Sequence, residues 1–317
     1  MLGDVEMVKV SDRDFSSVTV PMIAHSIWGE IPAPISLAQY AAVVEEWATT
    51  GNKRFPVDTW RGLPCIGWKV ESGLCRRLKW TIEPYDIARF RENSPTKNGY
   101  NLLMTNFERS LIDDARSQGL GYASNGRELK DLELLASLQH FGCATRLLDF
   151  TSNAFVALWF ACDRMHETAE VPGVVIGACS RKGNIFRKIT SPEEAGKNLE
   201  YFATEGFHIF AWSPMKAYER MHVQHSNFLF GQLYDGIWGS LSPSPFPPYE
   251  DEAPFVAIAI SNTLKEAAEG FFRNAFGYAA NSLFPDLSGF SQFHSAASGA
   301  AMKSRYDQLT SKDRSQK

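Results

Sequence analysis

The chain has 317 residues, of which 44% are hydrophobic and 21% are charged, and its formal net charge at pH 7 is −4. These proportions are those of a globular protein with a sizeable core, and they exclude an intrinsically disordered chain. A mildly acidic chain also lacks the broad basic surface by which proteins bind nucleic acid or anionic membranes, so neither class of partner is indicated.

The cysteines and the first residues of the chain indicate the cellular compartment in which the protein is expected. The five cysteines are scattered without a Cys-x-x-Cys pair, which indicates reduced thiols rather than a disulfide framework or a zinc site. The segment 1–10 carries charged residues and no long apolar run, unlike a secretory signal. No apolar stretch approaches the roughly 20 residues of a membrane-spanning helix. We therefore expect a cytoplasmic protein.

The first half of the chain predicts helices around a short strand. Residues 1–35 are mixed and rich in turn formers, and a helix capped by Ser36 is expected to run to Thr49. Thr59-Trp60-Arg61-Gly62 is typical of the end of a strand. Helices with one apolar face are predicted near 100–117 and 127–139.

The second half begins with an apolar segment, residues 154–162, whose length fits a buried helix or a buried strand. Its alanines and a preceding Thr151-Ser152 cap favour the helix. Strands are then predicted at 174–179, 207–212 and 254–260, and a helix at 263–274.

These elements do not alternate regularly as βαβ units, so we expect an α+β fold, a single mixed α/β domain. The expected organisation is an N-terminal extension at 1–35, a domain at 36–295 and a polar tail at 296–317.

Three segments hold unusual polar residues, and the first is Trp60-Arg61-Gly62. An arginine held by stacking on Trp60 would present a planar fork of donors suited to carboxylate or phosphate, and Gly62 would allow a ligand or another backbone to approach. The alternative is that Arg61 forms a structural ion pair, for instance with Asp58.

The second segment directly precedes the apolar helix and contains Gln139, His140, Arg146, Asp149, Thr151 and Ser152. Buried charges need partners, and an Arg146–Asp149 pair would meet that need. The N-terminus of the helix would also attract phosphate. Alternatively, the pair only pins the helix, Thr151 or Ser152 only caps it, and His140 is a structural histidine.

The third segment is 220–228. If it is extended, alternation places His222, Gln224 and Ser226 on one side, where they would hydrogen-bond a ligand. His222 and His225 are spaced for a metal, but no carboxylate or cysteine companion sits at suitable spacing, so no metal site is predicted. The sequence has no P-loop, no Gly-x-Ser-x-Gly elbow and no Gly-x-Gly-x-x-Gly loop.

Together and in this order, these motifs resemble the FRG domain family, which is named for an aromatic-Arg-Gly motif matched here by residues 60–62. The strongest resemblance runs from Leu138-Gln139-His140-Phe141-Gly142 through residues 145–151 into Ala157-Leu158-Trp159-Phe160-Ala161, with Ala144 where the family has proline. The stretch 220–228 and the ending Leu283-Phe284-Pro285-Asp286-Leu287-Ser288-Gly289 are similar to later family elements. The resemblance spans roughly residues 36–295.

The order of elements is also similar to that of ADP-ribosyltransferases, which implies a split sheet flanked by helices and NAD as the substrate. By this analogy Arg61 would hold the NAD phosphate or ribose, and Thr151 or Ser152 would brace the nicotinamide half. Gln224 stands where those enzymes have a catalytic glutamate, and Glu205 or Glu219 are the alternative carboxylates. The acceptor would be a macromolecule, and the protein an effector of phage defence or a toxin-like system.

Two other functions remain open. One is a non-catalytic module that senses a nucleotide or binds a protein partner through the same pocket. The other is a hydrolase that acts through His140, Asp149 and His222. In each case the expected ligand-binding residues are Trp60, Gly62, Gln139, His140, Arg146, Asp149, Ser152 and His222.

Overall fold

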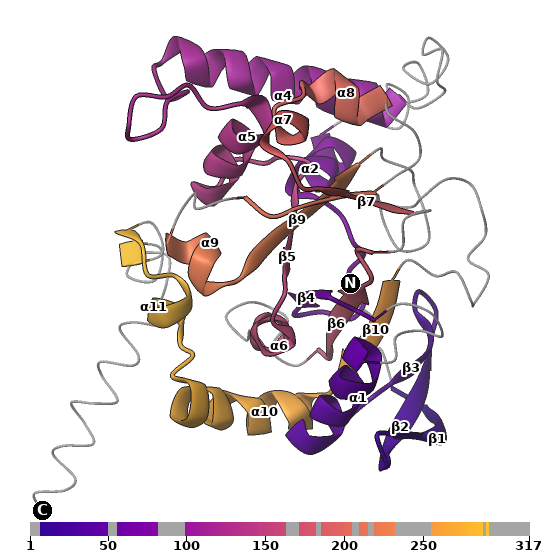
Figure 1. Cartoon of the computed structure of the whole chain (residues 1–317). Coiled ribbons are helices and arrows are strands. Elements are labelled where there is room, and N and C mark those ends of the chain that lie inside the picture. Colours follow the sequence, from indigo (N-terminus) through magenta and orange to yellow (C-terminus); the bar gives the residue numbers. More distant parts are fainter. Residues whose placement is uncertain are drawn as a thin grey trace, which may run out of the picture.

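The structure is a computed structural model, and it describes residues 7–49, 56–81, 99–162, 171–181, 185–204, 209–214, 219–231, 255–287 and 290–291. Helices and strands are mixed along the chain, as an α+β fold requires (Figure 1). Among the described residues, no helix combines the length and the apolar composition needed to cross a bilayer.

The N-terminal residues form a small antiparallel sheet in the order β1-β2-β3, which the sequence did not predict. Its strands are β1 Lys9–Phe15, β2 Val18–His25 and β3 Gly29–Pro32. Phe15 and Met22 pack against the helix α1 (Leu37–Thr49), in one core with Tyr40. This sheet is thus part of the packed structure.

A seven-stranded sheet organises the rest of the chain, in the order β10-β6-β4-β5-β9-β8-β7. All neighbours are antiparallel except β7 and β8. The strands are β4 Thr59–Leu63, β5 Leu148–Thr151, β6 Gly173–Ala178, β7 Phe186–Ile189, β8 Ile209–Trp212, β9 Ser226–Gly231 and β10 Phe255–Ile260.

The sheet divides between β4 and β5. Each of these strands pairs over its length with its other neighbour, but Trp60 opposite Thr151 is the one registered pair that joins them. If the antiparallel register continued, Gly62 would face Asp149, but the strands have separated there. Such a separation leaves backbone groups of both strands without ladder partners.

Helices cover the two halves of the sheet separately (Figure 1). The half that contains β4, β6 and β10 packs on α1, on α6 (Ala154–Ala161) and on α10 (Asn262–Phe271), which continues as a π-helix, η1 (Phe272–Phe276). The half that contains β8 and β9 packs on α4 (Gly99–Ser117), α5 (Asp131–His140) and α8 (Leu199–Thr204). The shorter helices are α2 Gly73–Thr81, α7 Pro192–Ala195, α9 Glu219–Val223 and α11 Ala280–Leu283.

The long elements agree with the sequence prediction, including the helical form of the apolar segment 154–161. Ser36 caps α1 by accepting the Gln39 backbone N–H at 3.2 Å. The predicted strand residues 207 and 208 and the polar tail 296–317 lie outside the described residues.

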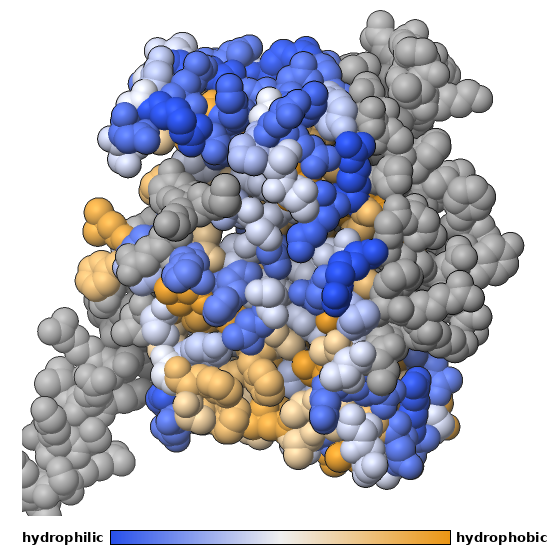
Figure 2. Space-filling model, in the orientation of Figure 1, coloured by the Kyte–Doolittle hydropathy of each residue, from blue (hydrophilic) through white to orange (hydrophobic). Residues whose placement is uncertain are grey.

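The surface differs between the two halves. Figure 2 shows hydrophilic residues over α4 and hydrophobic ones gathered over α10 and η1. Phe271 and Phe276 are exposed there, in edge-to-face contact at 5.3 Å between ring centroids. The apolar surface therefore belongs to the half of the molecule that carries β4.

Candidate functional site

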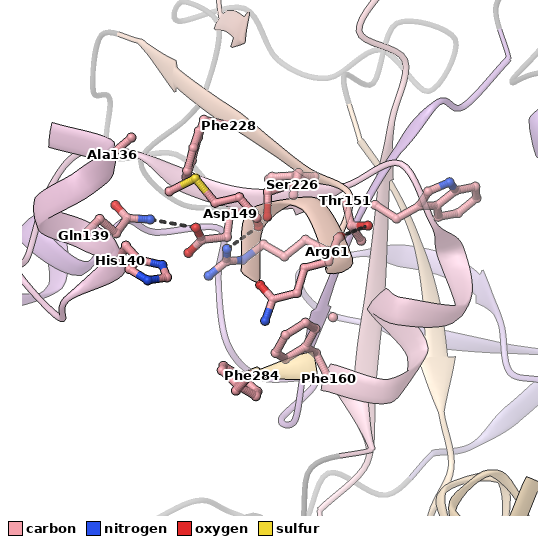
Figure 3. A pocket seen from close by; sticks show the side chains of 15 residues that line it. Arg61, Ala136, Gln139, His140, Asp149, Thr151, Phe160, Ser226, Phe228 and Phe284 are labelled. Carbon is pink, nitrogen blue, oxygen red and sulfur yellow. Dashed lines mark hydrogen bonds between the residues drawn. The ribbon is translucent and has the colours of Figure 1, made fainter. Parts of the chain in front are cut away.

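A pocket of about 240 Å³ opens where β4 and β5 separate. Its walls come from segments far apart in the sequence, which the close-up in Figure 3 shows converging on Arg61. The lining residues are Trp60, Arg61, Gly62, Ala136, Gln139, His140, Asp149, Phe150, Thr151, Phe160, Met221, Gln224, Ser226, Phe228 and Phe284. Each of the three polar segments contributes to this pocket, so the structure brings them together as predicted.

Arg61 uses only part of its hydrogen-bonding capacity. Its Nη1 donates to the Asp149 carbonyl oxygen at 2.6 Å, and this bond replaces the ladder bond lost where the strands separate. Its Nε is buried without an acceptor, and Arg61 forms no ion pair with any described residue. An unsatisfied buried donor of a cation is costly, so the site is suited to an anion.

The electrostatic surroundings of Arg61 support this interpretation. Burial is the main cause that lowers the pKa of Arg61 from its ordinary value; the charge of Asp149 raises it, and that of Arg76 lowers it further. An arginine nevertheless keeps its charge at neutral pH. A bound anion would offset both the desolvation and the repulsion from Arg76.

A directed chain of hydrogen bonds holds the Asp149 carboxylate. The Thr145 hydroxyl oxygen accepts the Leu147 backbone N–H at 3.2 Å, and the hydroxyl donates to Gln139 Oε1. The Gln139 carbonyl group therefore faces Thr145, and its amide Nε2 donates to Asp149 Oδ1 at 2.8 Å. The Asp149 carboxylate, which can only accept hydrogen bonds, sets the orientation of the Gln139 amide, and the Thr145 hydroxyl donates to the amide oxygen that this orientation presents.

Thr151 and Gln224 brace the opposite side of the pocket. Thr151 Oγ1 donates to the Gln224 carbonyl oxygen at 2.7 Å, and Gln224 Nε2 donates to the Leu283 carbonyl oxygen at 2.8 Å. These bonds tie β5 to the turn after α9 and to the end of α11. Both side chains are therefore committed to the framework of the pocket, apart from the Gln224 amide oxygen, which has no partner among the described residues.

Aromatic and apolar side chains complete the walls, and the sequence did not single them out as site residues. Phe160 of α6 and Phe284 lie edge to face, 6.0 Å between centroids, below Arg61 in the view of Figure 3. His140 Nε2 lies 3.5 Å from Asp286 Oδ2, two residues beyond Phe284. The run Phe284-Pro285-Asp286, quoted in the family resemblance, was the signal that could have placed this wall.

The environment of Trp60 differs from the prediction. Side chains alternate along β4, so Trp60 enters the core beneath α6 and does not lie on the same side of the strand as Arg61. Stacking on Trp60 therefore does not hold Arg61. The alternative ion pair with Asp58 is also wrong, because the Asp58 carboxylate accepts the Ser180 hydroxyl at 2.9 Å and lies 3.4 Å from Arg181.

Gly62 is needed for packing. A Cβ atom at this position would lie 1.8 Å from the Ala157 carbonyl oxygen, so α6 rests directly on the backbone of β4. The close backbone approach that the sequence predicted is thus made by a helix.

The predicted Arg146–Asp149 pair is not formed. Arg146 is fully buried outside the pocket, where its Nε donates to Glu108 Oε2 and its Nη2 donates to Thr105 Oγ1 at 2.8 Å. Glu108 Oε1 also accepts the Arg146 backbone N–H, at 2.6 Å. The sequence missed Glu108 because it lies on α4, 38 residues away from Arg146. Arg146 thus joins the loop before β5 to α4.

Two other predicted features take a different form. Asn153, and not Thr151 or Ser152, caps α6, since its Oδ1 accepts the Phe155 backbone N–H at 2.9 Å. Segment 220–228 is not extended throughout, because α9 ends at Val223 and a turn precedes β9. Gln224 and Ser226 line the pocket, whereas Ser152 and His222 are exposed and do not.

The described residues contain no group of three His, Cys, Asp or Glu side chains that could hold a metal ion. Asp149 carries the one carboxylate among the described residues that line the pocket. Of the two alternative carboxylates, Glu205 and the side chain of Glu219 lie outside the description.

Comparison with known proteins identifies the family. Neither the curated proteins nor the solved structures contain a match to this chain. A family model described as the FRG domain matches residues 59–170, which include the aromatic-Arg-Gly motif, the central motif and α6. The elements at 220–228 and 283–289 lie beyond the matched range, although Gln224 and Phe284 line the same pocket. Residues 59–170 of this chain are therefore an FRG domain.

Proposed function

We propose that the pocket binds NAD and that the protein transfers ADP-ribose from it to a macromolecular acceptor. The observation that carries the proposal is Arg61, a partly buried cation without an ion-pair partner among the described residues and with a buried, unused Nε donor. A guanidinium group of this kind is suited to a phosphate of the dinucleotide.

The shape of the pocket supports binding of part of the dinucleotide. Pockets that enclose whole drug-sized ligands measure about 300–1,000 Å³, and this one holds about 240 Å³. It would enclose one half of NAD and leave the other half outside. Phe160 and Phe284 supply the apolar surface that a nicotinamide or adenine ring requires.

A second function is favoured by a different observation, the neutral side chain of Gln224. An amide contributes only a dipole to a developing cation, whereas a carboxylate contributes a full charge. The Gln224 amide is also engaged with Leu283. The alternative is therefore a non-catalytic module that senses a nucleotide or binds a protein partner through the same pocket.

Release of nicotinamide distinguishes the two functions. Purified protein is incubated with NAD and cell extract, and the nucleotide and the extract proteins are analysed by mass spectrometry. The transferase releases nicotinamide and adds ADP-ribose to an acceptor, whereas the sensor retains unaltered nucleotide. Arg61→Gln should abolish either result, and Arg273→Gln, an exposed arginine on η1, is the matched control. Wild-type protein that neither binds nor consumes NAD would refute both.

An effector of phage defence or of a toxin-like system is the cellular role that fits such a transferase. Expression of the wild-type chain in a bacterial host should then slow growth, and the Arg61→Gln chain should not. Equal growth inhibition by both chains would show that the cellular effect does not depend on the pocket.

A further inference from the structure

No glutamate is among the described residues that line the pocket, and the structure offers another carboxylate for the role that a glutamate has in ADP-ribosyltransferases. Asp149 projects from β5 at the point where the sheet divides, beside the backbone carbonyl group that Arg61 binds. Its side chain is exposed at the pocket, and Oδ2 has no partner among the described residues. The group is thus accessible to a ligand held by Arg61.

We infer that Asp149 is the catalytic carboxylate of the pocket, and that Gln139 and Thr145 are positioning residues which direct it. This inference rests on the proposed function. The basis of this inference is geometric. The Asp149 carboxylate lines the same pocket as Arg61 (Figure 3), with one oxygen held by Gln139 and the other without a partner among the described residues.

The reaction gives this carboxylate a defined role. The C1′–N1 bond between ribose and the nicotinamide ring breaks, and its electron pair passes to the ring nitrogen, which leaves with neutral nicotinamide. Positive charge develops on C1′ and the ribose ring oxygen. A lone pair of the acceptor then forms the new bond to C1′, and the acceptor releases its proton to water.

Asp149 stabilises the positive charge in this step. A carboxylate fixed near a developing cation lowers the energy of the transition state more than that of the ground state, because the charge is larger there. A nucleotide that fills the pocket would cover the Asp149 side chain and exclude water, which strengthens the interaction. Arg61 meanwhile holds the phosphate. The positive charge of Arg61 thus binds one end of the enclosed part of NAD, and the negative charge of Asp149 stabilises the cation that develops at the other end.

The Asp149 carboxylate and the Thr145 hydroxyl together hold the Gln139 amide in one orientation. The Thr145 oxygen accepts the Leu147 N–H, and the Thr145 hydroxyl donates to Gln139 Oε1. Reversal of the amide would set its oxygen against the carboxylate, which only accepts hydrogen bonds, and would remove the acceptor of the Thr145 hydroxyl. Thr145 therefore keeps the Gln139 donor on Asp149 Oδ1 and leaves Oδ2 for the ligand.

The test compares Asp149→Asn with wild type, since the amide keeps the shape and an acceptor for Gln139 but removes the charge. NAD affinity is measured by calorimetry, and turnover by nicotinamide release. We expect the Kd to stay within about threefold and kcat to fall by about 100-fold or more. A kcat within about threefold of wild type would overturn the inference. If wild type itself releases no nicotinamide, the proposed transferase function fails and this inference fails with it.

Thr145 offers a matched pair that separates positioning from folding. Thr145→Ser keeps the hydroxyl group, and Thr145→Val removes it at nearly the same volume. With thermal unfolding measured in parallel, the valine variant should lose about 10-fold in kcat with little change in KM, and the serine variant should retain the wild-type rate. Equal rates in folded valine and serine variants would overturn the positioning role of Thr145, and if the valine variant does not fold, Asp149→Asn decides the inference.

Discussion

At the scale of single residues, most polar side chains near the pocket have a partner that the sequence cannot name. Tyr40, which does not line the pocket, follows the same pattern, since its hydroxyl donates to the Ala154 carbonyl oxygen at 2.7 Å. Burial, with a smaller contribution from Cys162, raises the pKa of Tyr40 well above its ordinary value. This bond joins α1 to the first residue of α6.

Tyr40→Phe is therefore expected to lower the free energy of unfolding by about 1 kcal/mol at pH 8, because one buried hydrogen bond is lost. A tyrosine whose folded-state pKa is raised contributes stability that is complete below its unfolded pKa of about 10 and is lost as pH rises above that value. The difference between wild type and Tyr40→Phe should accordingly shrink between pH 9 and 11. Urea denaturation across this range measures it, and a difference that stayed constant would contradict the assignment.

The residue scale is also where prediction from sequence was weakest. The central motif was predicted to form one site, but its charges were paired with each other because they are close in sequence. Arg146 instead reaches Glu108 on α4, and the Asp149 carboxylate accepts a hydrogen bond from Gln139. Partners that lie 38 residues apart depend on tertiary packing, which periodicity does not report.

At the scale of elements, the pocket depends on how closely α6 approaches β4. Gly62 permits that contact, and Gly173 on β6 is a second such position, where a Cβ atom would lie 2.4 Å from the Ala161 carbonyl oxygen. Two glycines on adjacent strands thus receive the backbone of one apolar helix. This contact positions Phe160, which lines the pocket from α6.

Gly62→Ala should destabilise the fold by about 3 kcal/mol or more, because the added methyl group meets backbone that can move only with the whole helix. Gly270→Ala in α10 is the control, since a Cβ atom there meets nothing within 4 Å. The control should stabilise the protein by about 0.5–1 kcal/mol through helix propensity. Chemical denaturation of both variants is the measurement. A loss below about 1 kcal/mol at Gly62 would show that α6 is not seated as described.

Elements themselves were predicted well where a periodic pattern was long, as in α1, α4 and α10. The strands β1 to β3 were missed because turn formers such as Pro21, Gly29 and Pro32 interrupt the β-branched runs of residues 1–35. β5 was also missed, since its four residues are too few for alternation to be recognised. Asp149 therefore could not be placed on a strand from sequence alone.

At the scale of the whole molecule, the divided sheet explains why the site forms where it does. Two halves with separate helical coverings meet at one registered pair, Trp60 and Thr151. Beyond that pair the strands separate, and Arg61 of one half binds the Asp149 backbone of the other. A ligand bound there would contact both halves. Binding of such a ligand should therefore stabilise the whole fold against unfolding.

Thermal unfolding of wild type, Arg61→Gln and Arg273→Gln with increasing NAD tests directly whether Arg61 binds NAD. A ligand that binds only the folded state adds RT ln(1 + [L]/Kd), about 2.7 kcal/mol at a hundredfold excess over Kd. Binding of NAD at Arg61 predicts a rising Tm for wild type and Arg273→Gln, and none for Arg61→Gln. No rise in wild type at millimolar NAD, or an equal rise in Arg61→Gln, would contradict it.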